Sequence, residues 1–258
     1  MRTAASHSVR RAAAGALLVL ASLVGPSAAS VRAQAAAEVD LAAIDRYVEE
    51  QREAQRVPGI ALGIVRDGEI VHLRGFGVAD SSGRALTAET PFITGSLSKS
   101  FTAVAIMQLA ERDALDLDAP VQRYLPWFRV ADSEASERIT LRHLLYQTSG
   151  LPARAGNHGI VDGDTSDAAL ERQVRALRSI ELANPVGLIH VYSNANYMTL
   201  GLVVQAVAGQ SYDDYVQEHI FTPLGMRQSF ASKDAARRAG LASGHRYWFG
   251  VPVPADLP

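Results

Sequence analysis

The stretch FITGSLSKSFTAVAIMQLAER, residues 92–112, joins a serine and a lysine three residues apart to a long apolar run. The run from about Ser96 to Arg112 is apolar on nearly every side, which predicts a buried helix. Three residues of helix place Ser96 and Lys99 on one face, so that the lysine amine can reach the serine hydroxyl. A neutral amine can accept the hydroxyl proton, and the helix N-terminus stabilises a developing oxyanion. The pair is therefore a candidate for nucleophilic catalysis.

The alternative interpretation of Lys99 is a solvated surface charge, because that is the usual state of a lysine on a helix. The chain holds 25 Lys and Arg residues, and only Lys99 and Lys233 are lysines. A lysine on a buried helix is costly unless it has a partner. We therefore favour a reactive pair over a surface charge.

Tyr192-Ser193-Asn194 is the second element of interest, and it directly precedes a run with helical periodicity from Tyr197. A tyrosine beside a lysine ammonium has a lowered pKa, because the opposite charge favours the phenolate. It can then act as a general base and acid. The Asn194 amide can hydrogen-bond a substrate carbonyl or steady the lysine. The alternative is a core tyrosine whose hydroxyl has a partner, but both short motifs in one chain favour a functional role.

The remaining segments indicate an α+β fold. An amphipathic helix is predicted over 40–55, and two apolar, β-rich runs at 60–66 and 69–77 are joined by Asp67-Gly68, a strong hairpin signal. Further helices are expected at 139–146, capped by Thr140, and at 168–179, 197–208 and 212–220. Residues 153–167 are rich in Gly and Asp and are expected to form a loop. A strand hairpin followed by many helices places the helical region after the first strands.

Composition excludes several classes of protein. The 258 residues include 25 basic and 27 acidic side chains, so the formal net charge is −2, without the basic excess of a nucleic-acid-binding protein. Cysteine is absent, which excludes thiolate metal sites, iron–sulfur clusters and a cysteine nucleophile. The histidines show no His-Glu-x-x-His spacing, so no metal is expected. We expect no cofactor and no nucleic-acid partner.

The N-terminus has the features of a secretory signal peptide. Arg2, Arg10 and Arg11 precede an apolar run, Ala12–Val24, and small residues follow it up to Ala35. The run is shorter than the roughly 20 residues that a membrane-spanning helix needs. We expect residues 1–35 to be a signal peptide and the protein to be periplasmic or secreted. Membrane attachment is expected only through an uncleaved signal.

A family resemblance rests on an ordered series of motifs. The series comprises Pro58-Gly59-Ile60-Ala61, Gly75-Phe76-Gly77-Val78-Ala79-Asp80, Thr94-Gly95-Ser96-Leu97-Ser98-Lys99, Leu141-Arg142-His143-Leu144-Leu145, Thr148-Ser149-Gly150-Leu151-Pro152, Tyr192-Ser193-Asn194 and Pro223-Leu224-Gly225-Met226. In content and order these resemble the serine β-lactamase and penicillin-binding superfamily, specifically its branch of class C β-lactamases, D-alanyl-D-alanine carboxypeptidases and family VIII esterases. The resemblance covers about residues 40–250.

The resemblance implies a fold and a set of roles. The β-lactamase-like fold has an antiparallel sheet built from N- and C-terminal segments, with a helical region inserted between them. In this chain the domain is expected to cover residues 36–258. Ser96 would be the acylated nucleophile, Lys99 its activating partner, Tyr192 the general base and Asn194 a substrate-binding amide.

The chain departs from the family pattern in one respect. The family's third motif, Lys-Thr-Gly or His-x-Gly on a strand, does not occur in this sequence. We expect the C-terminal strands and helix of the family to be missing and the domain to be incomplete, which leaves the activity of this chain an open question.

Two functions remain as hypotheses. The first is an exported serine hydrolase that forms an acyl-enzyme at Ser96 with an amide, a β-lactam or an ester, either a small molecule or a peptidoglycan-type substrate. The second is a non-catalytic domain that keeps the fold to bind peptidoglycan-like ligands or a partner.

Overall fold

The structure is a computed structural model that describes residues 39–157 and 168–255. The expected signal peptide, residues 1–35, lies outside the described residues, as does most of the expected loop at 153–167. Within the described ranges, no helix has both the length and the apolar character required to cross a bilayer.

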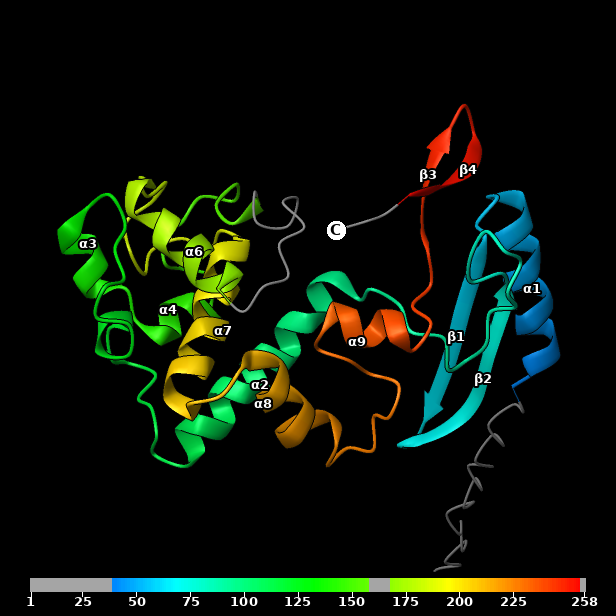
Figure 1. The fold of residues 1–258 in the computed structure, drawn as a ribbon, viewed down its shortest axis with the longest axis horizontal. Helices are drawn as coiled ribbons and strands as arrows, with labels where there is room; N and C mark the ends of the chain where they lie inside the picture. The colour runs from blue at the N-terminus through cyan, green and yellow to red at the C-terminus, as the bar shows by residue number, and fades with distance from the viewer. Residues whose placement is uncertain (1–38, 158–167, 256–258) are drawn as a thin grey trace, which may run out of the picture. The chain divides into compact units, whose positions relative to one another are not determined.

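In the described residues, helix α1 is followed by strands β1 and β2, then by a long helical region, and then by strands β3 and β4, as the colours of Figure 1 show. The α-helices are α1 Leu41–Ala54, α2 Ser98–Glu111, α3 Ser133–Arg138, α4 Leu141–Leu145, α6 Ala169–Ala176, α7 Asn194–Ala208, α8 Tyr212–Val216 and α9 Lys233–Arg238. The strands are β1 Gly59–Arg66, β2 Glu69–Gly77, β3 Gly244–Trp248 and β4 Val251–Ala255. Single 3-10 turns are η1 Gly95–Leu97, η2 Val121–Arg123 and η3 Leu177–Ser179, and η4 Gln217–Phe221 is a π-helical turn.

The predicted hairpin is confirmed as the antiparallel pair β1–β2. Its turn is Asp67-Gly68, and both residues have positive φ, 54° and 81°, as a tight two-residue hairpin turn requires. Helix α1 packs against β2 (Figure 1), where Asp45 Oδ1 lies 2.8 Å from His72 Nε2 and the same carboxylate also binds Arg74. The predicted amphipathic helix therefore covers one face of the hairpin.

A second hairpin, β3–β4, was not predicted. Its strand β4 contains Pro252 and Pro254, which lack the N–H that a ladder uses, and its turn has Phe249-Gly250 in place of an Asp-Gly or Asn-Gly signal. In the part of the chain that the structure describes, β1–β2 and β3–β4 are separate two-stranded sheets. The described residues therefore contain the N-terminal hairpin of the expected antiparallel sheet without a C-terminal strand paired to it, in agreement with the expectation that those strands are missing.

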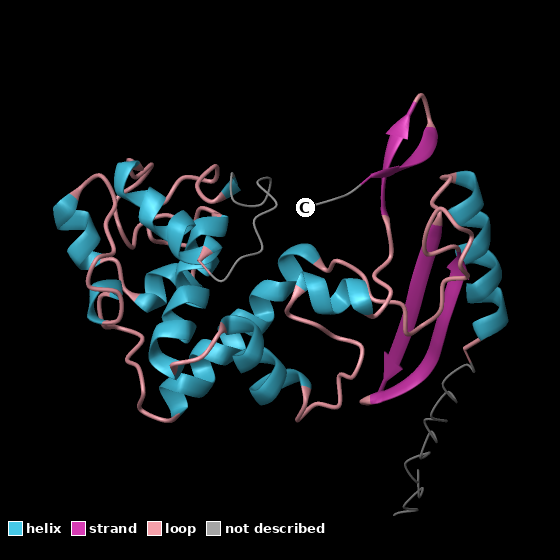
Figure 2. Ribbon diagram, viewed as in Figure 1, coloured by secondary structure: helices cyan, strands magenta, loops and turns pink. Residues whose placement is uncertain are grey.

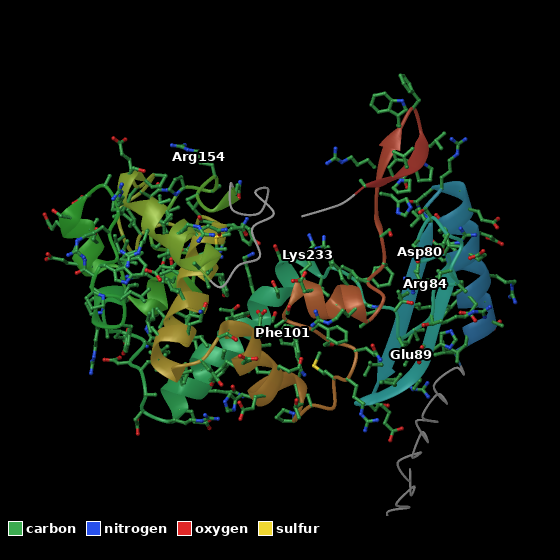
Figure 3. All side chains as sticks on the ribbon, viewed as in Figure 1. Asp80, Arg84, Glu89, Phe101, Arg154 and Lys233 are labelled. Atoms are coloured by element: carbon green, nitrogen blue, oxygen red, sulfur yellow. The ribbon has the colours of Figure 1, made fainter. Side chains whose placement is uncertain are left out.

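The segment that leads into β3 contacts the N-terminal part through its backbone and not as a paired strand. Ala242 N–H donates to Pro91 O at 2.9 Å, and Ser243 N–H donates to Ala79 O at 2.8 Å. Arg84 adds a side-chain link, because it pairs with Asp80 at 2.7 Å and donates to Gly240 O at 3.0 Å (Figure 3). These bonds hold the two segments side by side without extending either sheet.

Helices dominate between the two hairpins, as Figure 2 shows, and they build the hydrophobic core. Helix α7 is at its centre and contacts α2, α4, α6 and α8. Most of its buried residues are apolar, with Leu200, Val203 and Val204 fully buried, and Asn196 and Thr199 are buried polar residues among them. The predicted helices at 139–146 and 168–179 correspond to α4, whose cap is Thr140, and to α6 with η3. The short helices α3 and α9 were missed, because each has only six residues and little apolar periodicity.

Helix α2 corrects one expectation. Its buried side is Thr102, Ala105, Ile106 and Leu109. The opposite side is open in the described residues, with Val104 43% and Met107 50% exposed. The apolar pattern predicted burial all round, but a pattern reports only which side chains tolerate burial, and packing here covers a single side.

We expect Gly75→Ala to destabilise the β1–β2 region. A Cβ at Gly75 would lie 2.2 Å from Leu86 O and 2.7 Å from Thr87 Cα, and backbone atoms cannot move aside cheaply. The expected loss in the free energy of unfolding is about 1–3 kcal/mol, measured by urea denaturation.

Gly63→Ala in β1 is the matched control. A Cβ there meets only the flexible end of Leu73, at 3.3 Å, so this variant should be as stable as wild type. Equal stability of both variants would contradict the close approach of the 86–87 segment to β2.

Candidate active site

Ser96 lies in the 3-10 turn η1 that leads into α2. Gly95 has φ +56°, a left-handed conformation that glycine adopts without strain, and Ser98 Oγ donates back to Gly95 O at 2.7 Å. The α-helix itself begins at Ser98, so Ser96 stands just before the helix and does not open it as expected. Its hydroxyl is consequently exposed at the N-terminal end of α2.

Lys99 links the two predicted motifs. Its Nζ donates to Ser96 Oγ at 3.2 Å and to Asn194 Oδ1 at 2.8 Å. The amine also lies 4.9 Å from the centroid of the Tyr192 ring, within the range of a cation–π interaction. The lysine is half-buried, and each of these contacts favours a fixed position for its ammonium. The alternative interpretation of Lys99 as a solvated surface charge is therefore wrong.

Tyr192 completes the group. Its hydroxyl shares a 2.6 Å hydrogen bond with Ser96 Oγ. Hydrogen bonding with Lys99, and then with Ser96, lowers the pKa of the Tyr192 phenol, and partial burial opposes this effect only in part. The ring is 45% exposed, so the reactive oxygens face solvent. The structure therefore brings together Ser96, Lys99, Tyr192 and Asn194, the four residues that the sequence indicated.

A buried polar network holds the segment Tyr192–Asn194 in place. Gln147 Oε1 accepts hydrogen bonds from Ser193 N–H at 2.9 Å and from Asn196 Nδ2 at 2.5 Å. Ser149 Oγ donates to Asn196 Oδ1 at 2.6 Å. All four residues are buried, and no described buried side-chain nitrogen or oxygen is left without a partner. A fully satisfied network of this kind fixes one geometry, here that of the tyrosine and asparagine beside it.

Sequence analysis assigned no role to Gln147, Asn157 or Asn196. Asn157 Oδ1 accepts a hydrogen bond from Asn194 Nδ2 at 3.0 Å, so it touches the site from a segment well before α7 in the chain. One signal was available, because asparagine is a poor helix former and Asn196 lies inside a run that packs as a helix. A polar residue on a buried helix face needs a partner, which the sequence alone does not name.

The geometry suits proton transfer and nucleophilic attack. A hydroxyl between an amine and a tyrosine of lowered pKa is the arrangement of an activated nucleophile with an adjacent base. Among residues 39–157 and 168–255, no group of three or more His, Asp or Glu side chains is placed to hold a metal ion.

Comparison with known proteins is consistent with these motifs. A family model described as Beta-lactamase matches residues 44–258. Penicillin-binding protein 4 of Amycolatopsis lactamdurans is 35% identical over 207 residues, 80% of this chain and 53% of that protein. The chain thus spans about half the length of the curated relatives it matches.

Two solved structures have a similar fold. An octameric penicillin-binding protein homologue from Pyrococcus abyssi superposes with a TM-score of 0.71 at 32% identity, over 84% of this chain and 51% of that chain. EstCE1, a hydrolase with promiscuous acyltransferase activity, has a TM-score of 0.69 at 31% identity, over 83% and 58%.

We expect Asn196→Leu to destabilise the protein, because Ser149 Oγ loses its acceptor and Gln147 loses one donor inside the core. An unpaired buried polar group costs about 1–3 kcal/mol, so urea denaturation should show a loss of that size. As a control, Gln55→Leu removes an exposed Gln–Gln bond and should change stability by less than about 0.5 kcal/mol. An Asn196→Leu variant as stable as wild type would refute the importance of the network.

Proposed function

We propose a function on the premise that the chain belongs to the beta-lactamase family, as the motifs predicted and the match over residues 44–258 confirms. In this proposal the protein is an exported serine hydrolase that works through an acyl-enzyme at Ser96. Its substrate is an ester, an amide or a β-lactam, as a small molecule or as part of a peptidoglycan-type polymer. The observation that supports it is the placement of Ser96 Oγ 2.6 Å from the Tyr192 hydroxyl and 3.2 Å from the Lys99 amine.

Acylation begins with proton transfer from Ser96. The Tyr192 phenolate, which the Lys99 ammonium stabilises, accepts the proton of the Ser96 hydroxyl. The freed oxygen attacks the substrate carbonyl carbon, and the carbonyl electron pair moves onto the oxygen to form an oxyanion. Backbone N–H groups at the start of α2 and the positive end of its dipole stabilise that charge.

The tetrahedral intermediate then collapses. The carbonyl re-forms, the bond to the leaving group breaks, and Tyr192 returns its proton to the departing oxygen or nitrogen. In the second half-reaction a water molecule loses a proton to Tyr192 and attacks the ester at Ser96. Collapse of that intermediate releases the acid, and the proton returns to Ser96 Oγ. Each half-reaction uses the same base, so one tyrosine serves both steps.

Asn194 has a double role in this scheme. Its Oδ1 accepts from Lys99, while Nδ2 carries two N–H groups, one of which donates to Asn157. The second N–H is available to donate to a substrate carbonyl. Asn194 would thereby orient the substrate and the lysine together.

The proposal extends to processing and place of action. Residues 1–35 would be removed as a signal peptide, leaving a hydrolase domain over 36–258 in the periplasm or outside the cell. N-terminal sequencing of protein recovered from the periplasm or medium tests this directly, and an unprocessed Met1 start there would refute cleavage.

We expect Ser96→Ala to abolish covalent labelling by a fluorescent penicillin or an activated ester, because the attacking oxygen is lost. The measurement is in-gel fluorescence with mass spectrometry of the adduct. Ser100→Ala, an exposed serine in the same motif region, is the control and should label as wild type does. Labelling that persists in Ser96→Ala would locate the nucleophile elsewhere. Reversible binding of peptidoglycan fragments without an adduct in wild type would favour the non-catalytic binding role.

We expect Tyr192→Phe to slow acylation by about 10²–10⁴-fold, the usual contribution of a general base. Tyr197→Phe is the matched control, because Lys99 Nζ lies 5.9 Å from its ring but its hydroxyl donates to Leu145 O. That control should acylate within a few-fold of wild type. Equal rates in both variants would remove Tyr192 from the mechanism.

The pH dependence follows from the pKa of Tyr192. Because the base acts as a phenolate, the acylation rate should rise with pH and level off above the pKa of Tyr192. Lys99 and Ser96 lower that pKa, so the midpoint should fall below the ordinary tyrosine value of about 10. Stopped-flow acylation across pH measures it, and a midpoint at or above that value would contradict the proposed base.

A further inference from the structure

We propose that Asn157 is a positioning residue whose side-chain carbonyl sets the orientation of the Asn194 amide and, through it, holds Lys99 against Ser96. The proposal rests on the function proposed above, which gives Ser96, Lys99 and Tyr192 their chemical roles. Its geometry rests on the hydrogen bonds of the described residues. The chain of contacts runs from Asn157 Oδ1 to Asn194 Nδ2 at 3.0 Å, from Asn194 Oδ1 to Lys99 Nζ at 2.8 Å, and from Lys99 Nζ to Ser96 Oγ at 3.2 Å.

The orientation of Asn194 matters because its amide has one accepting end and one donating end. With Oδ1 toward the ammonium the contact is attractive and charge-assisted. If the amide were rotated by half a turn, its NH₂ group would meet the ammonium as donor against donor. An acceptor on the far side of Asn194 removes this ambiguity, because it attracts the NH₂ group away from Lys99. Asn157 Oδ1 is that acceptor.

The segment that ends at Asn157 approaches the start of α7 closely. Gly156 has φ +81°, and a Cβ there would lie 2.7 Å from Ala195 N and 3.0 Å from Met198 Sδ. Ala155 O accepts hydrogen bonds from Ala195 N–H and from Ser193 Oγ, each at 3.3 Å. Residues 155 and 156 thus dock on the first turn of α7, and Asn157 follows directly beside Asn194.

The contact with Asn157 also sets the direction of the second N–H of Asn194 Nδ2. One N–H of Nδ2 is used by Asn157, which fixes the plane of the amide and hence the direction of the second N–H. Asn157 is exposed and Asn194 half-buried, so this contact lies at the rim of the site and not in the core. Removing the Asn157 amide should therefore change the reactivity of the site and leave the fold intact.

Two variants of Asn157 distinguish an effect on the orientation of the Asn194 amide from the loss of a contact alone. Asn157→Ala removes the acceptor. Asn157→Asp keeps an acceptor of similar shape and offers no donor, so it can bind only the NH₂ end of Asn194. We expect acylation by a fluorescent penicillin or p-nitrophenyl ester to slow about tenfold in Asn157→Ala, the loss of about one orienting hydrogen bond, and to stay within about threefold of wild type in Asn157→Asp. Both variants should melt at the wild-type temperature.

A second measurement reads the position of Lys99 without any substrate. The chain has two lysines, so protein labelled with ¹³C at lysine Cε gives two signals, and Lys233→Arg assigns them. A fixed Lys99 ammonium makes its two Hε protons inequivalent. We expect that inequivalence in wild type and Asn157→Asp and its collapse in Asn157→Ala, while the Lys233 signal stays unchanged in every protein.

The two measurements can refute the proposed function and the positioning role of Asn157 separately. Absence of a Ser96 adduct in wild type would overturn the proposed function, whatever the lysine signals show. A Lys99 signal that is the same in Asn157→Ala and wild type would overturn the positioning role, even if wild type acylates. Equal slowing in Asn157→Ala and Asn157→Asp would also overturn it, because orientation predicts rescue by aspartate.

Discussion

The ammonium of Lys99 links the start of α2 to the start of α7 through the polar groups that surround it. It extends from the first turn of α2 and donates to the first residue of α7, while its hydrogen bonding and its charge lower the pKa of Tyr192. Ser96 depends on the same amine from the other side. A charge held by several partners keeps a narrow range of positions, so the placement of Lys99 determines the geometry of Ser96, Tyr192 and Asn194 together.

The residues that bind the Lys99 ammonium are held in place on two sides, one buried and one exposed. Beneath Tyr192 and Asn194 lies the buried network of Gln147, Ser149 and Asn196, where every polar atom has a partner and a single loss is costly. On the other side Tyr192 is exposed in the described residues, and the exposed Asn157 contacts Asn194. Stability and reactivity are thus served by different residues. Substitutions in the buried network should mainly lower the free energy of unfolding. Substitutions at Asn157 should mainly change the rate of the proposed reaction.

The sequence predicted the group of Ser96, Lys99, Tyr192 and Asn194 and much of the fold, for physical reasons that also explain its failures. Ser-x-x-Lys and Tyr-x-Asn are short, and their chemistry depends on local spacing, so Ser96, Lys99, Tyr192 and Asn194 were recognisable. The β1–β2 hairpin carries its own turn signal in Asp67-Gly68. By contrast, β3–β4 has prolines in a strand, and the partners of Asn194 and Asn196 come from distant loops. The exposed side of α2 was also unpredictable, because burial depends on what packs against a helix and not on its composition.

The distance along the chain between Ser96 and Tyr192 has a consequence for the order of folding. The β1–β2 hairpin and the capped helix α4 contain mostly local contacts and can form early. The hydroxyls of Ser96 and Tyr192 are 96 residues apart in sequence, so the chain must close a long loop before they meet. Packing of α2 against α7 provides the free energy for that closure. The group around Ser96 is therefore assembled late, and a chain released before those helices dock carries all four side chains without the geometry that the proposed reaction needs.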